Sequence, residues 1–103
     1  MPITGATQQF TKANVEAAPE KPGVYELIEN GTTIYYGESN VSIRARLIRH
    51  QDGTEGACTR AATHFRYELT TASASVTRQN ELLAEYRRLH DGKNPRCNEM
   101  GRG

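Results

Sequence analysis

Two tyrosines of this 103-residue chain, Tyr25 and Tyr35, come from short tripeptide motifs with glycine. Tyr25 ends the tripeptide GVY at 23–25, and Tyr35 begins the tripeptide YYG at 35–37. A buried pair of phenol groups could accept a proton or position a water molecule. The polar residues of interest that follow are Arg46, His50, Glu81 and Asn98. Proton transfer next to a positive charge is the chemistry that these residue types allow.

The segments that carry the two tyrosines are predicted to form a β-hairpin around the strong turn signal Asn-Gly at 30–31. A two-residue turn there pairs Tyr25 with Tyr36 and leaves Tyr35 on the opposite face of the sheet. A three-residue turn over 29–31 pairs Tyr25 with Tyr35 instead. If the two motif tyrosines act together, the sequence predicts the longer turn or an equivalent bulge.

Capping residues and apolar spacing predict three helices. The first begins after Thr11, the second begins near Val41 or Ser42 and runs to about Gln51, and the last spans about 76–90 with Ser75 as its cap. Arg46 and His50 are four residues apart and therefore share one flank of the second helix.

The last helix is predicted to bury an apolar stripe, with Glu81 at its edge and within reach of a cleft. The stripe consists of Leu82, Leu83, Tyr86 and Leu89.

Residues 64–69 alternate between apolar and polar types and predict a third strand. The predicted fold is α+β, with a three-stranded antiparallel sheet flanked by about three helices. We expect one domain over residues 1–103 with its core at about 22–98, and we expect 1–9 and 99–103 to be flexible.

Composition limits the partners of the chain. The 13 Lys and Arg residues nearly balance the 12 Asp and Glu residues, and the net charge is +1. A strongly basic nucleic-acid binder would carry an excess of positive charge, so any basic surface here must be local. No apolar run has the length of a signal peptide or a membrane span, so we expect a cytoplasmic protein without a membrane partner.

The two cysteines, Cys58 and Cys97, lack the paired spacing of a structural zinc site. We expect two free thiols, as is usual in the cytoplasm, and one disulfide is the alternative.

In order and spacing, the motifs resemble GIY-YIG nuclease domains, the module of homing endonucleases and of the excision-repair nuclease C subunit. The resemblance runs over about 22–98. Its segments are GVY at 23–25, YYG at 35–37, RLIRH at 46–50, RQNELL at 78–83 and PRCN at 95–98.

The chain departs from the family pattern in a few places. The stretch before Arg46 is one residue longer than usual, which leaves Arg44 as a rival, although only Arg46 has a His four residues later. Cys97 stands where an aromatic residue is common, and extra residues separate Glu81 from Asn98.

The resemblance implies a metal-dependent endonuclease that hydrolyses phosphodiester bonds in DNA. It assigns one Mg²⁺ or Mn²⁺ ion to Glu81 and a phosphate oxygen to Arg46. Tyr25 or Tyr35 would take the proton of the attacking water, and His50 is the candidate hydrogen-bond acceptor. Which of the two tyrosines is the base stays open.

Other residues of the motifs are expected to support the site. Gly23 and Gly37 would allow close approach of backbones, and Asn98 would tie the tail to the helix that carries the site. The chain has no room for a separate DNA-reading domain, so sequence specificity is either low or supplied by a protein partner. The alternative function, which the near-neutral charge favours, is a module that binds nucleic acid or protein without cutting.

Overall fold

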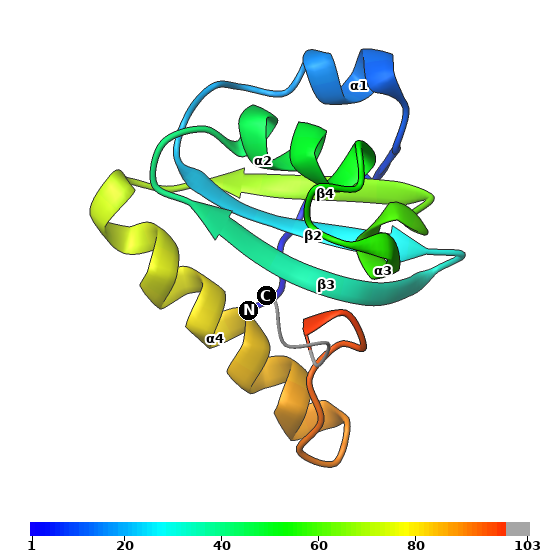
Figure 1. The fold of residues 1–103 in the computed structure, drawn as a ribbon. Coiled ribbons are helices and arrows are strands. Elements are labelled where there is room, and N and C mark those ends of the chain that lie inside the picture. The colour runs from blue at the N-terminus through cyan, green and yellow to red at the C-terminus, as the bar shows by residue number, and fades with distance from the viewer. Residues whose placement is uncertain (99–103) are drawn as a thin grey trace.

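The computed structural model describes residues 1–98, whose sheet has four antiparallel strands in the order β1-β4-β2-β3 (Figure 1). The strands are β1 (Gln8–Gln9), β2 (Gly23–Glu29), β3 (Thr32–Ser39) and β4 (His64–Leu69). The predicted α+β class and its three strands are confirmed. The fourth strand, β1, is two polar residues at the edge of the sheet, too short to show an alternating pattern in the sequence.

Helices cover both faces of this sheet. They are α1 (Lys12–Glu16), α2 (Ile43–Gln51), α3 (Ala57–Arg60) and α4 (Ser75–Leu89), with a 3₁₀ turn at Ala72–Ala74. Figure 1 shows α1 and α2 over one face and α4 against the other. The side chain of Thr11 accepts a hydrogen bond from the first turn of α1, and that of Ser42 accepts one from the first turn of α2.

The start of α4 differs from the prediction. Ala74 occupies the N-cap position, and the Ser75 hydroxyl donates a hydrogen bond to Glu38 Oε1 at 2.7 Å instead of capping the helix. Leu82 is buried as predicted, whereas Leu89 is 63% exposed, so its place in the buried stripe is wrong. Leu83 and Tyr86 pack against the core as partly buried side chains, so the apolar stripe ends before the last turn.

The β2–β3 hairpin combines a two-residue turn with a bulge. Asn30 and Gly31 have φ values of 49° and 85°, the left-handed conformation that a type I′ turn requires. A bulge then shifts the register of the two strands between Leu27 and Ile28. As a result, Tyr25 lies opposite Gly37 and Tyr35 lies opposite Leu27. The predicted bulge and shared face are confirmed, but the direct pairing of Tyr25 with Tyr35 is wrong.

Two cores hold the layers together. Between the sheet and helices α1 and α2 lie Val15, Leu27, Ile43, Leu47 and Phe65, all fully buried. Between the sheet and α4 lie Ile3, Val24, Tyr36 and Leu82. Burial of each large apolar side chain stabilises the fold by about 1.5–3 kcal/mol, which fixes α2 and α4 on opposite faces.

The first residues of the chain are part of this structure. Ile3 is buried, and Gln8 and Gln9 pair with Phe65 and His64 of β4, in contrast to the flexible segment expected there. The same expectation for 99–103 falls outside the described residues.

The tail after α4 returns to the edge strand β3. Cys97 forms a disulfide with Cys58 of α3, and its N–H donates to Ile34 O at 2.9 Å. The expectation of free thiols is wrong because the fold brings the two Cα atoms to 5.6 Å, a distance suited to a disulfide. A separation of 39 residues hides this proximity in the sequence.

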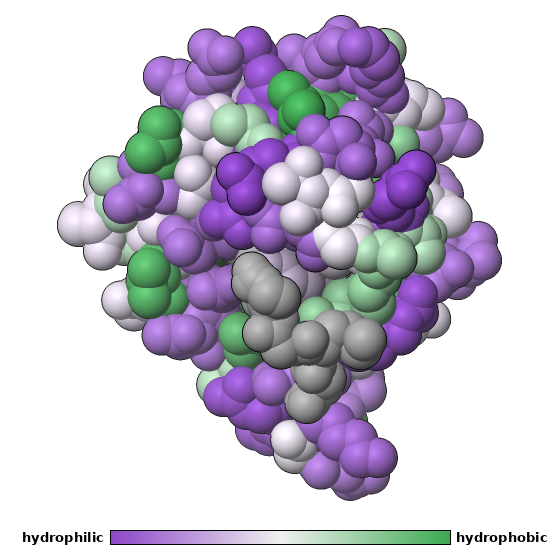
Figure 2. All heavy atoms as spheres, in the orientation of Figure 1, coloured by the Kyte–Doolittle hydropathy of each residue, from purple (hydrophilic) through white to green (hydrophobic). Residues whose placement is uncertain are grey.

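The outer surface is mostly polar on the face shown in Figure 2, where hydrophobic side chains are scattered rather than gathered into one patch. Among residues 1–98, no helix combines the length and the apolar character needed to cross a membrane.

Candidate active site

A chain of buried hydrogen bonds joins strand β2 to helices α2 and α3. Tyr25 Oη lies 2.7 Å from His50 Nε2, and His50 Nδ1 lies 2.8 Å from Thr59 Oγ1. The exposed fractions of Tyr25, His50 and Thr59 are 0%, 1% and 3%. The sequence predicted the partnership of a tyrosine with His50. It gave no signal for Thr59, which belongs to a segment without periodic pattern.

The Tyr35 ring completes this cluster from strand β3. Its centroid lies 5.0 Å from the His50 ring and 6.2 Å from the Tyr25 ring. Gly37 makes room for the arrangement, because a Cβ atom at this position would lie 2.3 Å from Tyr25 Cζ. The glycine of the second motif therefore has a steric role beside the first motif's tyrosine. Gly23 is equally tight, since a Cβ there would lie 2.3 Å from Glu68 O.

Arg46 reaches the same side of the molecule from α2. Its Nη1 donates to Glu38 O at 3.3 Å, and its Nε lies 3.7 Å from Glu55 Oε2. Nε is buried and makes no hydrogen bond within residues 1–98, although 29% of the side chain is exposed. The rival Arg44 donates instead to Ala18 O at 2.8 Å and pairs with Glu20, away from the tyrosines.

Glu55 is a carboxylate of this region that sequence reasoning missed. Only 7% of its side chain is exposed, and its Oε2 lies 2.7 Å from Arg49 Nε. Burial raises the pKa of Glu55, but the Arg49 hydrogen bond and the Arg46 charge outweigh burial and lower it. Glu55 is therefore an anion that balances two arginines.

Burial sets the protonation states of the central pair. Burial lowers the pKa of His50 from 6.5 to about 4, so the imidazole is neutral at pH 7. Burial also raises the pKa of Tyr25 well above 10, and the nearby Tyr35 adds to this shift. For Arg46, burial lowers the pKa, and the acidic groups around it reverse the shift and raise it. The resting site is a neutral phenol and imidazole beside a guanidinium cation.

The structure does not bring Glu81 to this group. Its carboxylate lies 3.3 Å from Arg78 Nη1, and Arg78 in turn pairs with Glu68 of β4 at 2.8 Å. Strand β2 separates β4 from β3 in the sheet, and 60% of the Glu81 side chain is exposed. Glu81 lines a surface pocket with Met1, Pro2, Thr4, Glu68 and Arg78.

A different residue of α4 faces strand β3. Gln79 Nε2 donates to Tyr36 O at 3.2 Å, and Ser75, one turn earlier, bonds to Glu38. Two residues along a helix correspond to a rotation of about 200°, so Gln79 and Glu81 lie on opposite flanks of α4. Among residues 1–98, no three His, Cys, Asp or Glu side chains are grouped to hold a metal ion.

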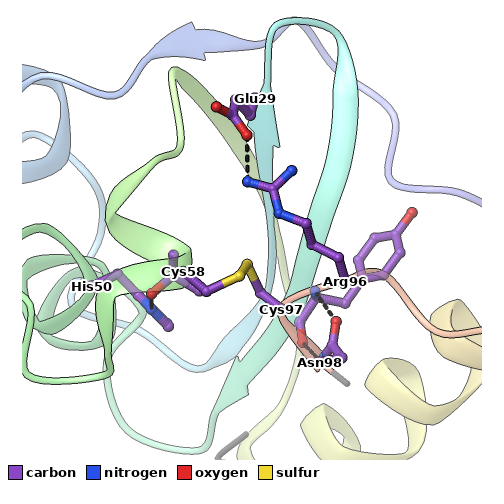
Figure 3. The surroundings of a disulfide bond; sticks show 8 residues. Glu29, His50, Cys58, Arg96, Cys97 and Asn98 are labelled. Carbon is purple, nitrogen blue, oxygen red and sulfur yellow. Dashed lines mark hydrogen bonds and ion pairs between the residues drawn. A yellow bond between two sulfur atoms is a disulfide. The ribbon is translucent and has the colours of Figure 1, made fainter. Parts of the chain in front are cut away.

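Asn98 ties the tail to the sheet. Its Oδ1 accepts from Tyr36 N and its Nδ2 donates to Tyr36 O, both at 3.0 Å. The predicted tying of the tail is present, but the partner is strand β3 and not the helix that carries Arg46 and His50. Figure 3 shows this contact next to the disulfide.

Two comparisons with known proteins give a match. Residues 1–89 match the profile of a family described as a domain of unknown function (DUF7508). A search of curated proteins gives no match. Among solved structures, the chain is similar to the GIY-YIG N-terminal endonuclease domain of UvrC from Thermotoga maritima, a point mutant bound to its catalytic divalent cation. The TM-score is 0.66 at 21% identity, over 84% of this chain and 91% of that chain, so the predicted GIY-YIG fold is confirmed.

Proposed function

This chain belongs to the family described as a domain of unknown function (DUF7508), and from its GIY-YIG endonuclease fold we propose that it is an endonuclease that hydrolyses phosphodiester bonds in DNA. The observation that carries the proposal is the buried bond between Tyr25 and His50 beside the unfilled Nε of Arg46. Proton transfer and phosphate binding are the two tasks that phosphodiester hydrolysis requires.

Arg46 is the phosphate-binding group of the proposal. Its guanidinium is charged and partly open to solvent, and its Nε makes no hydrogen bond within residues 1–98, although it lies 3.7 Å from Glu55 Oε2. A planar guanidinium binds two phosphate oxygens at once, which a lysine ammonium does not do as well. Arg46 would stabilise the negative charge that grows on the phosphate during attack by water.

Tyr25, Tyr35 and His50 are the proton-handling groups. A phenol with a raised pKa removes a proton from water only if its own proton can leave at the same time. Neutral His50 has one unprotonated ring nitrogen that can accept it. Because Tyr25 is fully buried with its hydroxyl against His50, the water that it deprotonates would be one bound at the site and not bulk water. As Tyr25 takes the proton of that water, its own proton would pass to His50 Nε2.

A divalent cation enters the proposal through the similar UvrC domain, which was solved with its catalytic cation. The residues of this chain do not fit the site that the sequence predicted, because Glu81 pairs with Arg78 beside β4 and lies apart from Arg46 and His50. We therefore assign no step to a cation. A requirement for Mg²⁺ or Mn²⁺, and its binding by Glu81, stay predictions for the assay.

A DNA-nicking assay tests the proposal on supercoiled plasmid and on branched DNA, with Mg²⁺, Mn²⁺ or EDTA. We expect the wild-type chain to nick DNA and Arg46→Ala to lose this activity. Arg44→Ala is the matched control, because this arginine lies on the same helix and contacts Ala18 and Glu20 instead. Loss of nicking in Glu81→Ala would support cation binding by Glu81, and unchanged nicking would exclude it. No nicking of any DNA would overturn the endonuclease proposal.

A second function is favoured by the side chains of α4. The residue that faces β3 is the amide Gln79, and the acidic Glu81 is on the other flank. A module that binds DNA without cutting it would need Arg46 but no acidic group at this position. Binding of a fluorescent DNA that weakens in Arg46→Ala, with no cleavage under any cation condition, would identify this second function.

A further inference from the structure

The two ring nitrogens of His50 have different hydroxyl partners: Nε2 contacts Tyr25, and Nδ1 contacts Thr59. A neutral imidazole carries a proton on one ring nitrogen and a lone pair on the other. Both hydroxyl partners, Tyr25 Oη and Thr59 Oγ1, can either donate or accept, so two arrangements satisfy the measured distances of 2.7 and 2.8 Å. The arrangement decides whether His50 can take a proton from Tyr25.

The chemistry of the two hydroxyls favours one arrangement. A phenol is a more acidic donor than an aliphatic alcohol, and an alcohol oxygen is the better acceptor because its lone pairs are not shared with an aromatic ring. Tyr25 should therefore donate to His50 Nε2, and His50 Nδ1–H should donate to Thr59. We infer that Thr59 is a positioning residue that holds the His50 proton on Nδ1 and leaves Nε2 free to accept the proton of Tyr25.

The disulfide holds Thr59 in this position. Thr59 directly follows Cys58 in α3, which has four residues and no side-chain cap. So short a helix has little stability of its own. Cys58 is bonded to Cys97, whose neighbour Asn98 makes two hydrogen bonds to Tyr36 of β3. Figure 3 shows the disulfide running from Cys58, close to His50, to the tail.

Reduction should therefore release Thr59 from His50. A dithiol reductant such as dithiothreitol supplies two electrons and two protons, so that Cys58 and Cys97 become thiols and the reductant becomes a cyclic disulfide. Helix α3 then keeps only its non-covalent contacts. The consequence for DNA cleavage rests on the proposed function, whereas the consequence for the His50 proton does not.

The test reads the His50 proton directly by NMR of the ¹⁵N-labelled chain at pH 7, where the imidazole is neutral. We expect the wild type to carry the proton on Nδ1 and Thr59→Ser to do the same. Thr59→Val keeps the shape but removes the acceptor, so its proton should move at least partly to Nε2. A proton on Nε2 in the wild type, or an unchanged Nδ1–H in a folded Thr59→Val variant, would overturn the inference.

Reduction gives the second readout. Dithiothreitol should mix the two His50 tautomers in the wild type, and Cys58→Ala/Cys97→Ala should show the mixture with or without reductant. If the chain nicks DNA, Thr59→Val should slow nicking by about 10- to 100-fold, the usual cost of a misplaced reacting group, and Thr59→Ser should restore it. A chain that never nicks DNA but shows these tautomers would refute the proposed function alone. Normal nicking by Thr59→Val with Nδ1–H retained would refute the inference alone.

Discussion

The two faces of the sheet each hold a buried charged cluster, and the clusters differ in how fully their hydrogen bonds are used. On the α4 face, Glu26 is 2% exposed and all its near partners are donors. Arg66 Nε lies 2.6 Å away, and the hydroxyls of Thr33 and Tyr36 donate to the same carboxylate. On the α2 face, Arg46 is surrounded by acidic groups, yet its buried Nε is without a hydrogen bond in the described chain.

This difference separates structural charge from reactive charge. A buried ion with all its partners stabilises one arrangement of the fold and has no capacity for a ligand. A buried donor without a partner costs free energy unless something else fills it. The Glu26 cluster therefore has the character of a structural element, whereas the Arg46 cluster matches the phosphate-binding role proposed above for Arg46.

The largest expected effect is on the structural cluster. Glu26→Ala would leave Arg66 and the Tyr36 hydroxyl without their buried partner, and we expect a loss of about 3 kcal/mol in the free energy of unfolding. Burial and the charge of Glu26 raise the pKa of Tyr36 to about 12, so absorbance titration should show this pKa falling in the variant. Urea denaturation measures the stability. Glu26→Gln, which keeps the shape, should lose less, and equal losses would mean that the charge is unimportant.

Acid should act mainly through the α2 face. The unfolded chain protonates His50 near pH 6.5, whereas the folded chain resists protonation until about pH 4. Between these values the unfolded state binds more protons, so stability falls as the pH is lowered. We expect this residue to contribute a loss of about 3 kcal/mol between pH 6.5 and pH 4.

Urea denaturation at pH 7, 5.5 and 4 measures the acid effect, and His50→Gln is its control. The variant should lose the part of the pH dependence that His50 causes. If wild type and variant weaken in parallel, another group is responsible and His50 is not buried as a neutral imidazole.

Part of the Tyr25, Tyr35, Arg46 and His50 arrangement could be predicted from the sequence. The Asn30-Gly31 turn signal predicted the hairpin. The shared face of Tyr25 and Tyr35 was predicted only on condition of a longer turn or a bulge, and the bulge between Leu27 and Ile28 provides it. The four-residue spacing of Arg46 and His50 gave their common flank. These predictions worked because each depends on contacts within one element or between adjacent elements.

The rest depends on packing between distant segments. The apolar stripe of α4 has two edges, and the sequence placed Glu81 at an edge without saying which edge faces β3. Docking of Leu82 against the sheet decides this, and it turns Gln79 to β3. Thr59 was missed, and the Cys58–Cys97 disulfide was only the alternative to free thiols, for the same reason: α3 acquires its role only where it meets α2 and the tail.

The reactive cluster should show its character in activity more than in stability. Arg46→Ala removes the unfilled donor, and we expect DNA nicking to fall at least about 100-fold, or about 2.7 kcal/mol in transition-state stabilisation. Its free energy of unfolding should fall by less than this, by about 1–2 kcal/mol, because the variant loses the bond to Glu38 O and the ion pair with Glu55, while Arg49 still pairs with Glu55. Single-turnover nicking and urea denaturation provide the two measurements. Equal and large losses in both would make Arg46 a structural residue like Arg66.

The smallest effect on stability should come from the exposed ion pair of Arg78 and Glu81 on α4. Unlike the two buried clusters, this pair is in contact with solvent. Glu81 is 60% exposed, and Arg78 keeps two hydrogen bonds to Glu68 when Glu81 is replaced. Exposed ion pairs contribute about 0–1 kcal/mol, so Glu81→Gln should change stability by less than about 1 kcal/mol. Glu68→Gln is the matched comparison and should cost more, because it weakens the bonds that hold Arg78. A larger loss for Glu81→Gln than for Glu68→Gln in urea denaturation would contradict this order, and it would mean that Glu81 has a buried partner on the α4 face.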